Sequence, residues 1–249
     1  MAMTLQATDM QTITKPQKAP VPAGHGHKSA TVRKCRISSL SRDGSVRVSE
    51  QIIPATNRFE PAFSGFARGT LLDTDQGPVA VEDLHPGMRL MTAEFGAMPL
   101  LWVGSITLFP RINGRDKVDE CLTRVMADTY GMSRPDCDLI AGPGGRVLAR
   151  SPSAADAHKS ERVLIPVYEL ANGMNVIKIT PQRPVQVYHV CLQEHVTLTA
   201  AGLEVESYHP GYGFEHAMGA NLLAFFLSLF PHIRTPKDFG KLSHPRLPF

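Results

Sequence analysis

Glycine and proline interrupt this chain at nearly regular intervals, which limits what it can fold into. The 249 residues include 20 Gly and 20 Pro, with short apolar segments between them. Both residues break helices, whereas turns between strands use them readily. The pattern therefore argues against a helical bundle. It favours an all-β fold made of short strands, long enough to bury a substantial core.

Two parts of the sequence carry the clearest strand patterns. Residues 185–192 alternate between apolar and polar positions, which predicts a strand with one buried face. Residues 36–40 and 46–52 flank Asp43-Gly44, a dipeptide suited to reversing a strand pair. We therefore expect a leading β-hairpin near the N-terminus.

Helical signals are few and short. Residues 79–84 predict a single helical turn that ends before Pro86. Near the other end, Asn221 predicts the N-cap of a helix that runs to Phe230 and stops at Pro231. The predicted organisation has four parts: a disordered tail at 1–30, the hairpin at 31–62, one β domain at 63–211, and a C-terminal helix and tail at 212–249. Residues 151–160 are polar and predict a mobile loop.

Composition restricts the possible partners and ligands. The formal net charge is +3, and no basic run is long enough to follow a phosphate backbone, so nucleic acid is not an expected partner. The four cysteines are far apart and form no C-x-x-C pair, which predicts neither a zinc knuckle nor a disulfide framework. The first 30 residues lack the apolar core of a Sec signal, and no run is long enough to span a membrane. By default we expect a soluble, cytoplasmic protein without a cofactor.

Residues 66–90 read FARGTLLDTDQGPVAVEDLHPGMRL. This stretch resembles the opening of a Hint domain, the family of Hedgehog autoprocessing domains, inteins and bacterial relatives. In the family, a Cys or Ser starts the domain, followed by a short strand, a turn, a one-turn helix and a second strand. Trp102 lies in a segment similar to one in the bacterial members. The resemblance implies a Hint-type (Hedgehog/intein) horseshoe of short strands across about three fifths of the chain.

The same resemblance implies that the autoprocessing chemistry is lost. The family's first residue attacks the preceding carbonyl, and Gly65 stands at that position without a nucleophilic atom. A block-B histidine protonates the leaving amine, and Gly145 stands there, with Gly142 at the hydroxyl position. Register places Glu206 and Ser207 where inteins carry a His-Asn pair. If the glycines have positive φ, restoring side chains would also strain the backbone.

Three other residues are candidates for remaining chemistry. Ser64 precedes the vacated position, and its hydroxyl would perform an N-to-O acyl shift with His189 or His195 as proton donor. The alternative is that Ser64 satisfies a backbone group in a turn and that the histidines are packing residues. A zinc site of His189, Cys191 and His195 is disfavoured, because His195 lies beyond a turn from the strand face that the other two share.

The sequence therefore predicts a degenerate Hint domain that does not cleave itself and is kept as an interaction or assembly module for a protein partner. Its rivals are residual autoproteolysis at Ser64, and an exported accessory protein in which residues 222–230 form a docking helix.

Overall fold

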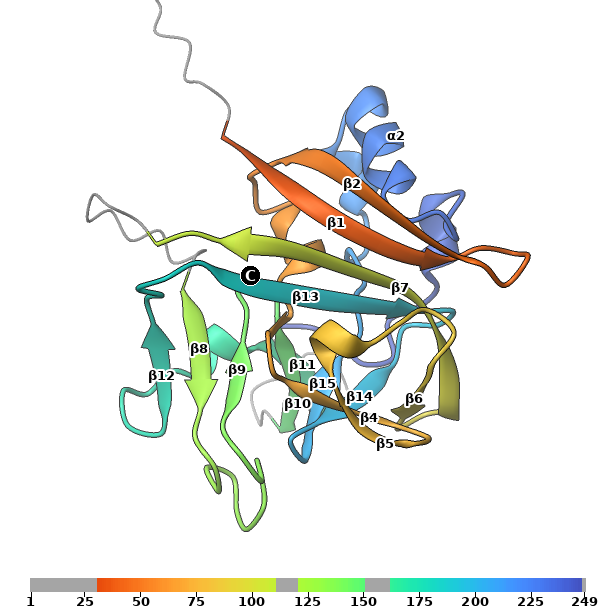
Figure 1. Cartoon of the computed structure of the whole chain (residues 1–249). Helices are drawn as coiled ribbons and strands as arrows, with labels where there is room; N and C mark the ends of the chain where they lie inside the picture. Colours follow the sequence, from red (N-terminus) through yellow and green to blue (C-terminus); the bar gives the residue numbers. More distant parts are fainter. Residues whose placement is uncertain (1–30, 111–120, 151–161, 248–249) are drawn as a thin grey trace, which may run out of the picture.

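A computed structural model describes residues 31–110, 121–150 and 162–247 of the chain (Figure 1). These residues form a mostly antiparallel sheet, which confirms the all-β prediction. The strands are β1 (Val32–Leu40), β2 (Val46–Pro54), β3 (Phe66–Ala67), β4 (Leu71–Thr74), β5 (Gly77–Ala80), β6 (Arg89–Thr92), β7 (Gly96–Leu108), β8 (Leu122–Val125), β9 (Leu139–Ala141), β10 (Arg146–Arg150), β11 (Arg162–Pro166), β12 (Val176–Ile179), β13 (Val185–Leu192), β14 (Thr197–Ala200) and β15 (Leu203–Glu206).

Helical structure within the described ranges is short. One α-helix, α2 (Ala220–Ser228), is accompanied by the 3-10 turns η1 (Glu60–Phe63), η2 (Val81–Asp83), η4 (Val167–Leu170), η5 (Phe214–Ala217) and η6 (Pro236–Phe239). None of the described helices is long and apolar enough to cross a membrane.

The long strands β7 and β13 organise the sheet. They pair antiparallel from Val185 opposite Leu108 to Leu192 opposite Leu100, with a register shift after Cys191. The hairpin β1–β2 adds to the other edge of β7, while the first residues of β7 turn away to pair with β6 (Figure 1). β13 also pairs with the two-residue strand β3, which in turn meets β9. The start of the predicted Hint region is therefore held in the middle of the sheet.

The alternation along β13 separates two cores. Tyr188 and Val190 face a cluster formed by strands of the Hint region, whereas Val187 and Cys191 face a second cluster on the opposite side. Successive side chains of a strand point to opposite faces of the sheet, as the alternating sequence pattern predicts. Here both faces are covered, so the strand is buried almost throughout.

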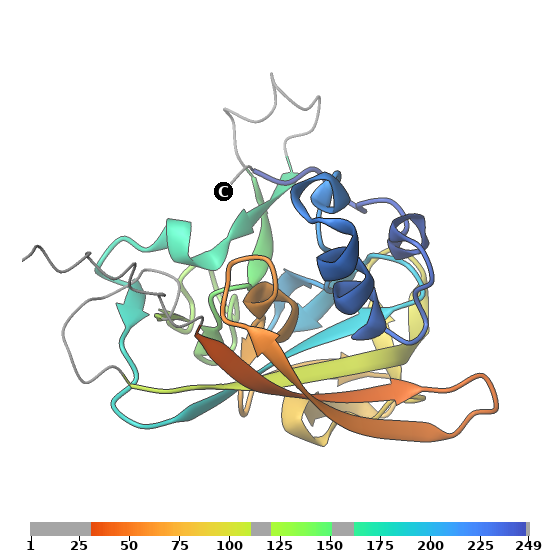
Figure 2. The ribbon, with the colours of Figure 1, turned by 90° about the horizontal axis from the view of Figure 1, so that it is seen from above.

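The second core joins the two ends of the described chain. Trp102 on β7 is fully buried, and its Nε1–H donates to the Leu229 carbonyl at 2.7 Å. Its ring stacks on Phe230 with centroids 4.7 Å apart, and Phe59 packs edge-on to Phe226. Figure 2 shows α2 beside the β1–β2 hairpin. The segments on either side of the Hint region thus share one hydrophobic cluster.

Two local predictions were wrong. Residues 79 and 80 belong to β5, where they pair with Leu72 and Leu71, and only Val81–Asp83 form a helical turn. Pairing with β4 satisfies backbone groups that a longer helical turn would have used. The helix begins at Ala220 with Gly219 at the N-cap, so Asn221 lies inside it and makes no side-chain cap. The predicted tail at 1–30 and the predicted loop at 151–160 lie outside the described residues.

Candidate functional site

The peptide between Ser64 and Gly65 lies where η1 passes into β3. Phe66 pairs with Tyr188 on one side and Ala141 on the other, so the chain enters the sheet at this point. The loop after β9 binds this peptide and the next one through its backbone. Gly144 N–H donates to the Ser64 carbonyl at 2.9 Å, and Gly142 N–H donates to the Gly65 carbonyl at 3.0 Å. The structure therefore brings Gly65 and the 142–145 loop into direct contact.

Glycine is required in this loop by close backbone approach. A Cβ at Gly142 would lie 2.1 Å from the Ser64 carbonyl oxygen, and one at Gly145 would lie 2.5 Å from the Gly65 carbonyl oxygen. Neither these two residues nor Gly65 is among the described glycines with positive φ, so left-handed backbone is not the reason for glycine here. The expected strain from positive φ is therefore absent at these glycines. An added side chain is instead excluded by nearby backbone atoms.

His189 fills the space in front of Gly65. A Cβ built on Gly65 would lie 2.8 Å from the imidazole Nε2 and Cδ2 atoms. The ring is held edge-on against Phe66 and Tyr208, each with centroids 5.4 Å away. Its Nδ1 accepts the Val190 N–H at 3.1 Å. Complete burial lowers the pKa of His189 to about 3, so the ring is neutral at pH 7.

Ser64 is buried, and its hydroxyl donates to the Glu60 carbonyl at 2.8 Å, four residues back. No hydrogen bond joins it to His189 or His195 within the described residues. A serine nucleophile needs a base within hydrogen-bond distance. The observed contact is instead the one expected of a serine that satisfies the last turn of a short helix.

His195 occupies a separate position, between β13 and β14. Its Nε2 lies 3.0 Å from Glu206 Oε1. On the other side of the ring, Nδ1 lies 2.9 Å from the backbone nitrogen of Ser243 and 3.1 Å from its Oγ. The ring thus connects the end of β15 with the C-terminal segment.

Glu206 is a buried carboxylate with several cationic neighbours. Arg246 Nε donates to Oε1 at 2.7 Å, and Arg146 Nε lies 3.7 Å from Oε2. Burial alone would raise the pKa of Glu206, but the His195 hydrogen bond and the Arg246 charge outweigh it and lower the pKa to about 2. Glu206 is therefore ionised at neutral pH.

A cleft of about 200 Å³ opens beside these groups. Its lining includes His189, Glu206, Tyr208, Arg58, Arg146 and Arg246. The sequence pointed to Glu206 only because it stands at the position of the intein His-Asn pair. It gave no indication of Arg246, which is 40 residues away along the chain. No local pattern in the C-terminal segment indicates this contact.

The three residues considered for zinc do not converge. Cys191 faces the second core, with Sγ 3.4 Å from His232 Nε2, while His195 is bound to Glu206. Burial raises the pKa of the Cys191 thiol to about 12. In the described parts of the chain, no group of three or more His, Cys, Asp and Glu side chains could hold a metal ion.

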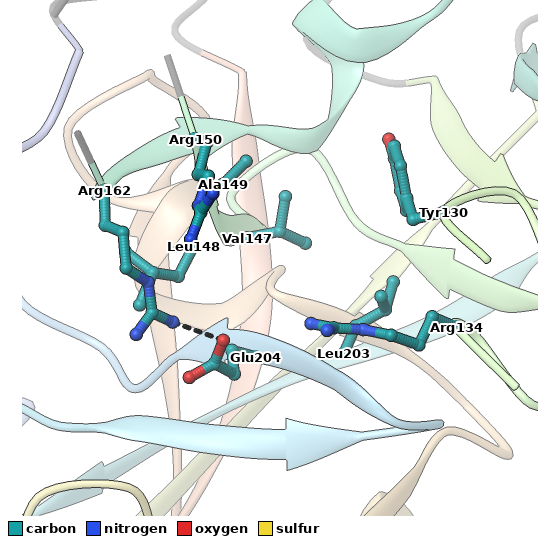
Figure 3. A pocket seen from close by; sticks show the side chains of 9 residues that line it. All are labelled: Tyr130, Arg134, Val147, Leu148, Ala149, Arg150, Arg162, Leu203 and Glu204. Atoms are coloured by element: carbon teal, nitrogen blue, oxygen red, sulfur yellow. Dashed lines mark hydrogen bonds and ion pairs between the residues drawn. The ribbon is translucent and has the colours of Figure 1, made fainter. Parts of the chain in front are cut away.

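A second cavity, of about 420 Å³, lies over β10, β11 and β15 (Figure 3). Tyr130, Arg134 and Leu203 line it, and Arg162 forms an ion pair with Glu204 at its edge. None of the candidate site residues is among its lining residues.

Comparison with known proteins identifies the family. A Hint domain family model matches residues 64–212. No curated protein matches the chain. The match covers more than half of the 249 residues and begins at Ser64, next to Gly65, where the resemblance predicts the first residue of the domain. The protein with this β-sheet and this glycine-lined junction is a member of the Hint domain family.

Proposed function

We propose that this protein is a degenerate Hint domain that does not cleave itself and serves as an interaction or assembly module. The observation that supports this most directly is the position of His189. Its ring lies where the side chain of a nucleophile at Gly65 would begin. The space for the first chemical step is therefore occupied.

The proton chemistry supports the same proposal. An acyl shift needs a nucleophile and then an acid to protonate the leaving amine. Gly65 and Gly145 supply neither group. His189 is close to the peptide, but burial keeps its pKa near 3, so it carries no imidazolium proton at pH 7 to give. The hydrogen bond from Gly144 N–H to the Ser64 carbonyl fixes this peptide without providing either group.

The segment before the junction is packed into the same core as the Hint region, which also favours an assembly role. Phe59, Ala62 and Phe63 precede the junction and are fully buried. β1 pairs with β7 over five residues. Cutting the chain at residue 64 or 65 would leave an N-terminal piece whose core lies inside the remaining protein. A protein that acted by releasing this segment would have to separate a shared hydrophobic core, which is costly.

The hairpin offers an interaction surface. Within the described sheet, β2 pairs with β1 alone, so its other edge is unpaired. Val48 and Ile52 on β2 are 54% and 66% exposed. Unpaired edges accept an additional strand through backbone hydrogen bonds. An extended segment of a protein partner fits this edge, which Figure 2 shows along the outside of the molecule.

Residual autoproteolysis at Ser64 is the alternative function. It requires the hydroxyl to leave the Glu60 carbonyl and to find a base. The geometry around Ser64 gives this alternative no specific support.

The first test is the intact mass of the full-length protein after long incubation at neutral pH with hydroxylamine or a thiol, which trap esters and thioesters. We expect a single species of unchanged mass. Ser64→Ala is the matched control and should behave in the same way. A fragment that begins at Ser64 or Gly65, and that disappears in Ser64→Ala, would establish the alternative.

The second test restores a nucleophile. Gly65→Cys should give no cleavage and should lower the stability, because its Cβ would lie 2.8 Å from the His189 ring. When Gly65→Cys is combined with His189→Ala, the loss measured by urea unfolding should be smaller than the sum of the two single losses, because the clash is gone. The double variant should still remain uncleaved because a proton donor is missing. Rapid thiol-dependent cleavage of the single variant would show that the site is functional apart from the nucleophile.

A further inference from the structure

We propose that Ser243, His195 and Glu206 form a nucleophile, base and carboxylate triad that hydrolyses small esters. This site is separate from the vacated Hint position, and it does not depend on the function proposed above. It is assembled from the loop before β14, the end of β15 and the C-terminal segment.

The hydrogen bonds run in series through one imidazole. Ser243 Oγ lies 3.1 Å from His195 Nδ1, and His195 Nε2 lies 3.0 Å from Glu206 Oε1. A serine, a histidine and a carboxylate at such distances are the arrangement by which an alcohol is activated as a nucleophile. The three residues lie 48 and 11 positions apart in the sequence, so the fold alone brings them together.

The backbone determines which nitrogen of His195 is the base. The Ser243 N–H donates to Nδ1 at 2.9 Å, so Nδ1 carries the lone pair and the ring proton is on Nε2. Nε2–H then donates to Glu206, which is ionised. The Nδ1 lone pair faces both the backbone N–H and the hydroxyl of Ser243, so Nδ1 accepts the hydroxyl proton when it gives up the backbone hydrogen bond. Glu206 orients the ring and stabilises the imidazolium that forms.

Electrostatics and burial support the same assignment. The His195 side chain is completely buried, and that of Glu206 is 2% exposed. Arg246 balances the carboxylate through its Nε, and its Nη2 donates to the His209 carbonyl at 2.7 Å. A buried, ionised carboxylate that keeps its counter-charge can hold the ring in place without protonating.

A cavity of about 460 Å³ gives Ser243 a place to meet a substrate. Tyr212, Leu242 and Pro245 supply apolar surface, and Arg246 also borders the cavity. This lining suits an ester with a short acyl chain.

The reaction is complete with water as the second reactant. Ser243 Oγ bonds to the ester carbonyl carbon while its proton passes to His195 Nδ1, and the tetrahedral intermediate then releases the alcohol, which takes that proton. Water attacks the acyl-serine with Nδ1 again as the base. Collapse of the second intermediate breaks the carbon–Oγ bond, releases the carboxylic acid and returns the proton to Oγ.

The test uses the full-length protein with a fluorophosphonate probe, and separately with 4-nitrophenyl acetate. We expect one covalent adduct, mapped to Ser243 by peptide mass spectrometry. Ser243→Ala should abolish the adduct and lower kcat/KM for the ester by about 100-fold or more. The alanine keeps the backbone N–H that binds His195, so the C-terminal segment stays anchored and the unfolding midpoint should be unchanged.

Ser228→Ala is the matched control, because this exposed serine on α2 bonds only to a carbonyl of its own helix among the described contacts. It should leave labelling and hydrolysis unchanged. An absent adduct on folded protein, an adduct at another residue, or equal hydrolysis by Ser243→Ala would each overturn the proposal. Ser243 would then be an anchoring residue for the C-terminal segment.

Discussion

Lowering the pH from 7 to 5 should bring this protein close to unfolding, because two buried histidines and the half-buried His232 are held neutral in the fold. Burial lowers the pKa of His189 and His209 to about 3 and that of His232 to about 4, from an ordinary value of 6.5. In the unfolded chain these side chains take up protons as soon as the pH falls below that ordinary value. Acid therefore favours the unfolded state.

The direction and the size of the effect follow from linkage. For a histidine with a lowered pKa, the stability is fully present above pH 6.5 and is lost as the pH falls toward the pKa in the fold. Each pH unit in that interval costs about 1.4 kcal/mol per histidine, so the three together cost about 6 kcal/mol at pH 5. Typical domains have about 5–15 kcal/mol in total. The carboxyl pKa of Glu206 is also lowered, so this residue reduces the free energy of unfolding only below pH 4.5, the ordinary pKa of a glutamate.

Urea unfolding at pH 7, 6 and 5 measures this effect. His232→Leu should reduce the loss between pH 7 and 5 by about one third, since it removes one of the three histidines with the largest lowering of the pKa. His216→Gln is the matched control, because the His216 side chain is 85% exposed, and it should leave the pH dependence unchanged. A free energy of unfolding that stays constant from pH 7 to 5 would contradict the burial of neutral histidines.

Gly142→Ala should be a strongly damaging methyl addition in the Hint region. Its Cβ would lie 2.1 Å from the Ser64 carbonyl oxygen, which is backbone and cannot rotate away. Relief requires moving the loop and losing the hydrogen bond from Gly142 N–H to the Gly65 carbonyl. We expect a loss of about 3 kcal/mol or more in the free energy of unfolding.

Gly219→Ala is the control for this prediction. A Cβ at Gly219 meets no atom within 4 Å, and the residue has a φ of −69° at the N-cap of α2. Its replacement should cost less than about 1 kcal/mol. Equal unfolding free energies for the two variants would show that the 142–145 loop adapts easily, and that its glycines are not required by close packing.

The sequence by itself determined the class of fold and the position of the Hint region. The alternating pattern of residues along Val185–Leu192 predicts a strand, and the structure places alternate side chains of this strand in different cores. The resemblance of residues 66–90 to the opening of a Hint domain indicated the family that the match at 64–212 then showed. These features depend on residues a few positions apart, which local patterns record directly.

The tertiary structure alone decided how the site is filled. His189 meets Gly65 because β13 pairs with β3, and nothing near either residue in the sequence specifies that contact. Ser243 and Arg246 reach His195 and Glu206 across 48 and 40 residues. Such contacts depend on the combined packing of strands and of the shared second core, so no local periodicity encodes them. The sequence thus predicted which residues stand at the Hint site, and the fold decided that the His189 ring lies against Gly65.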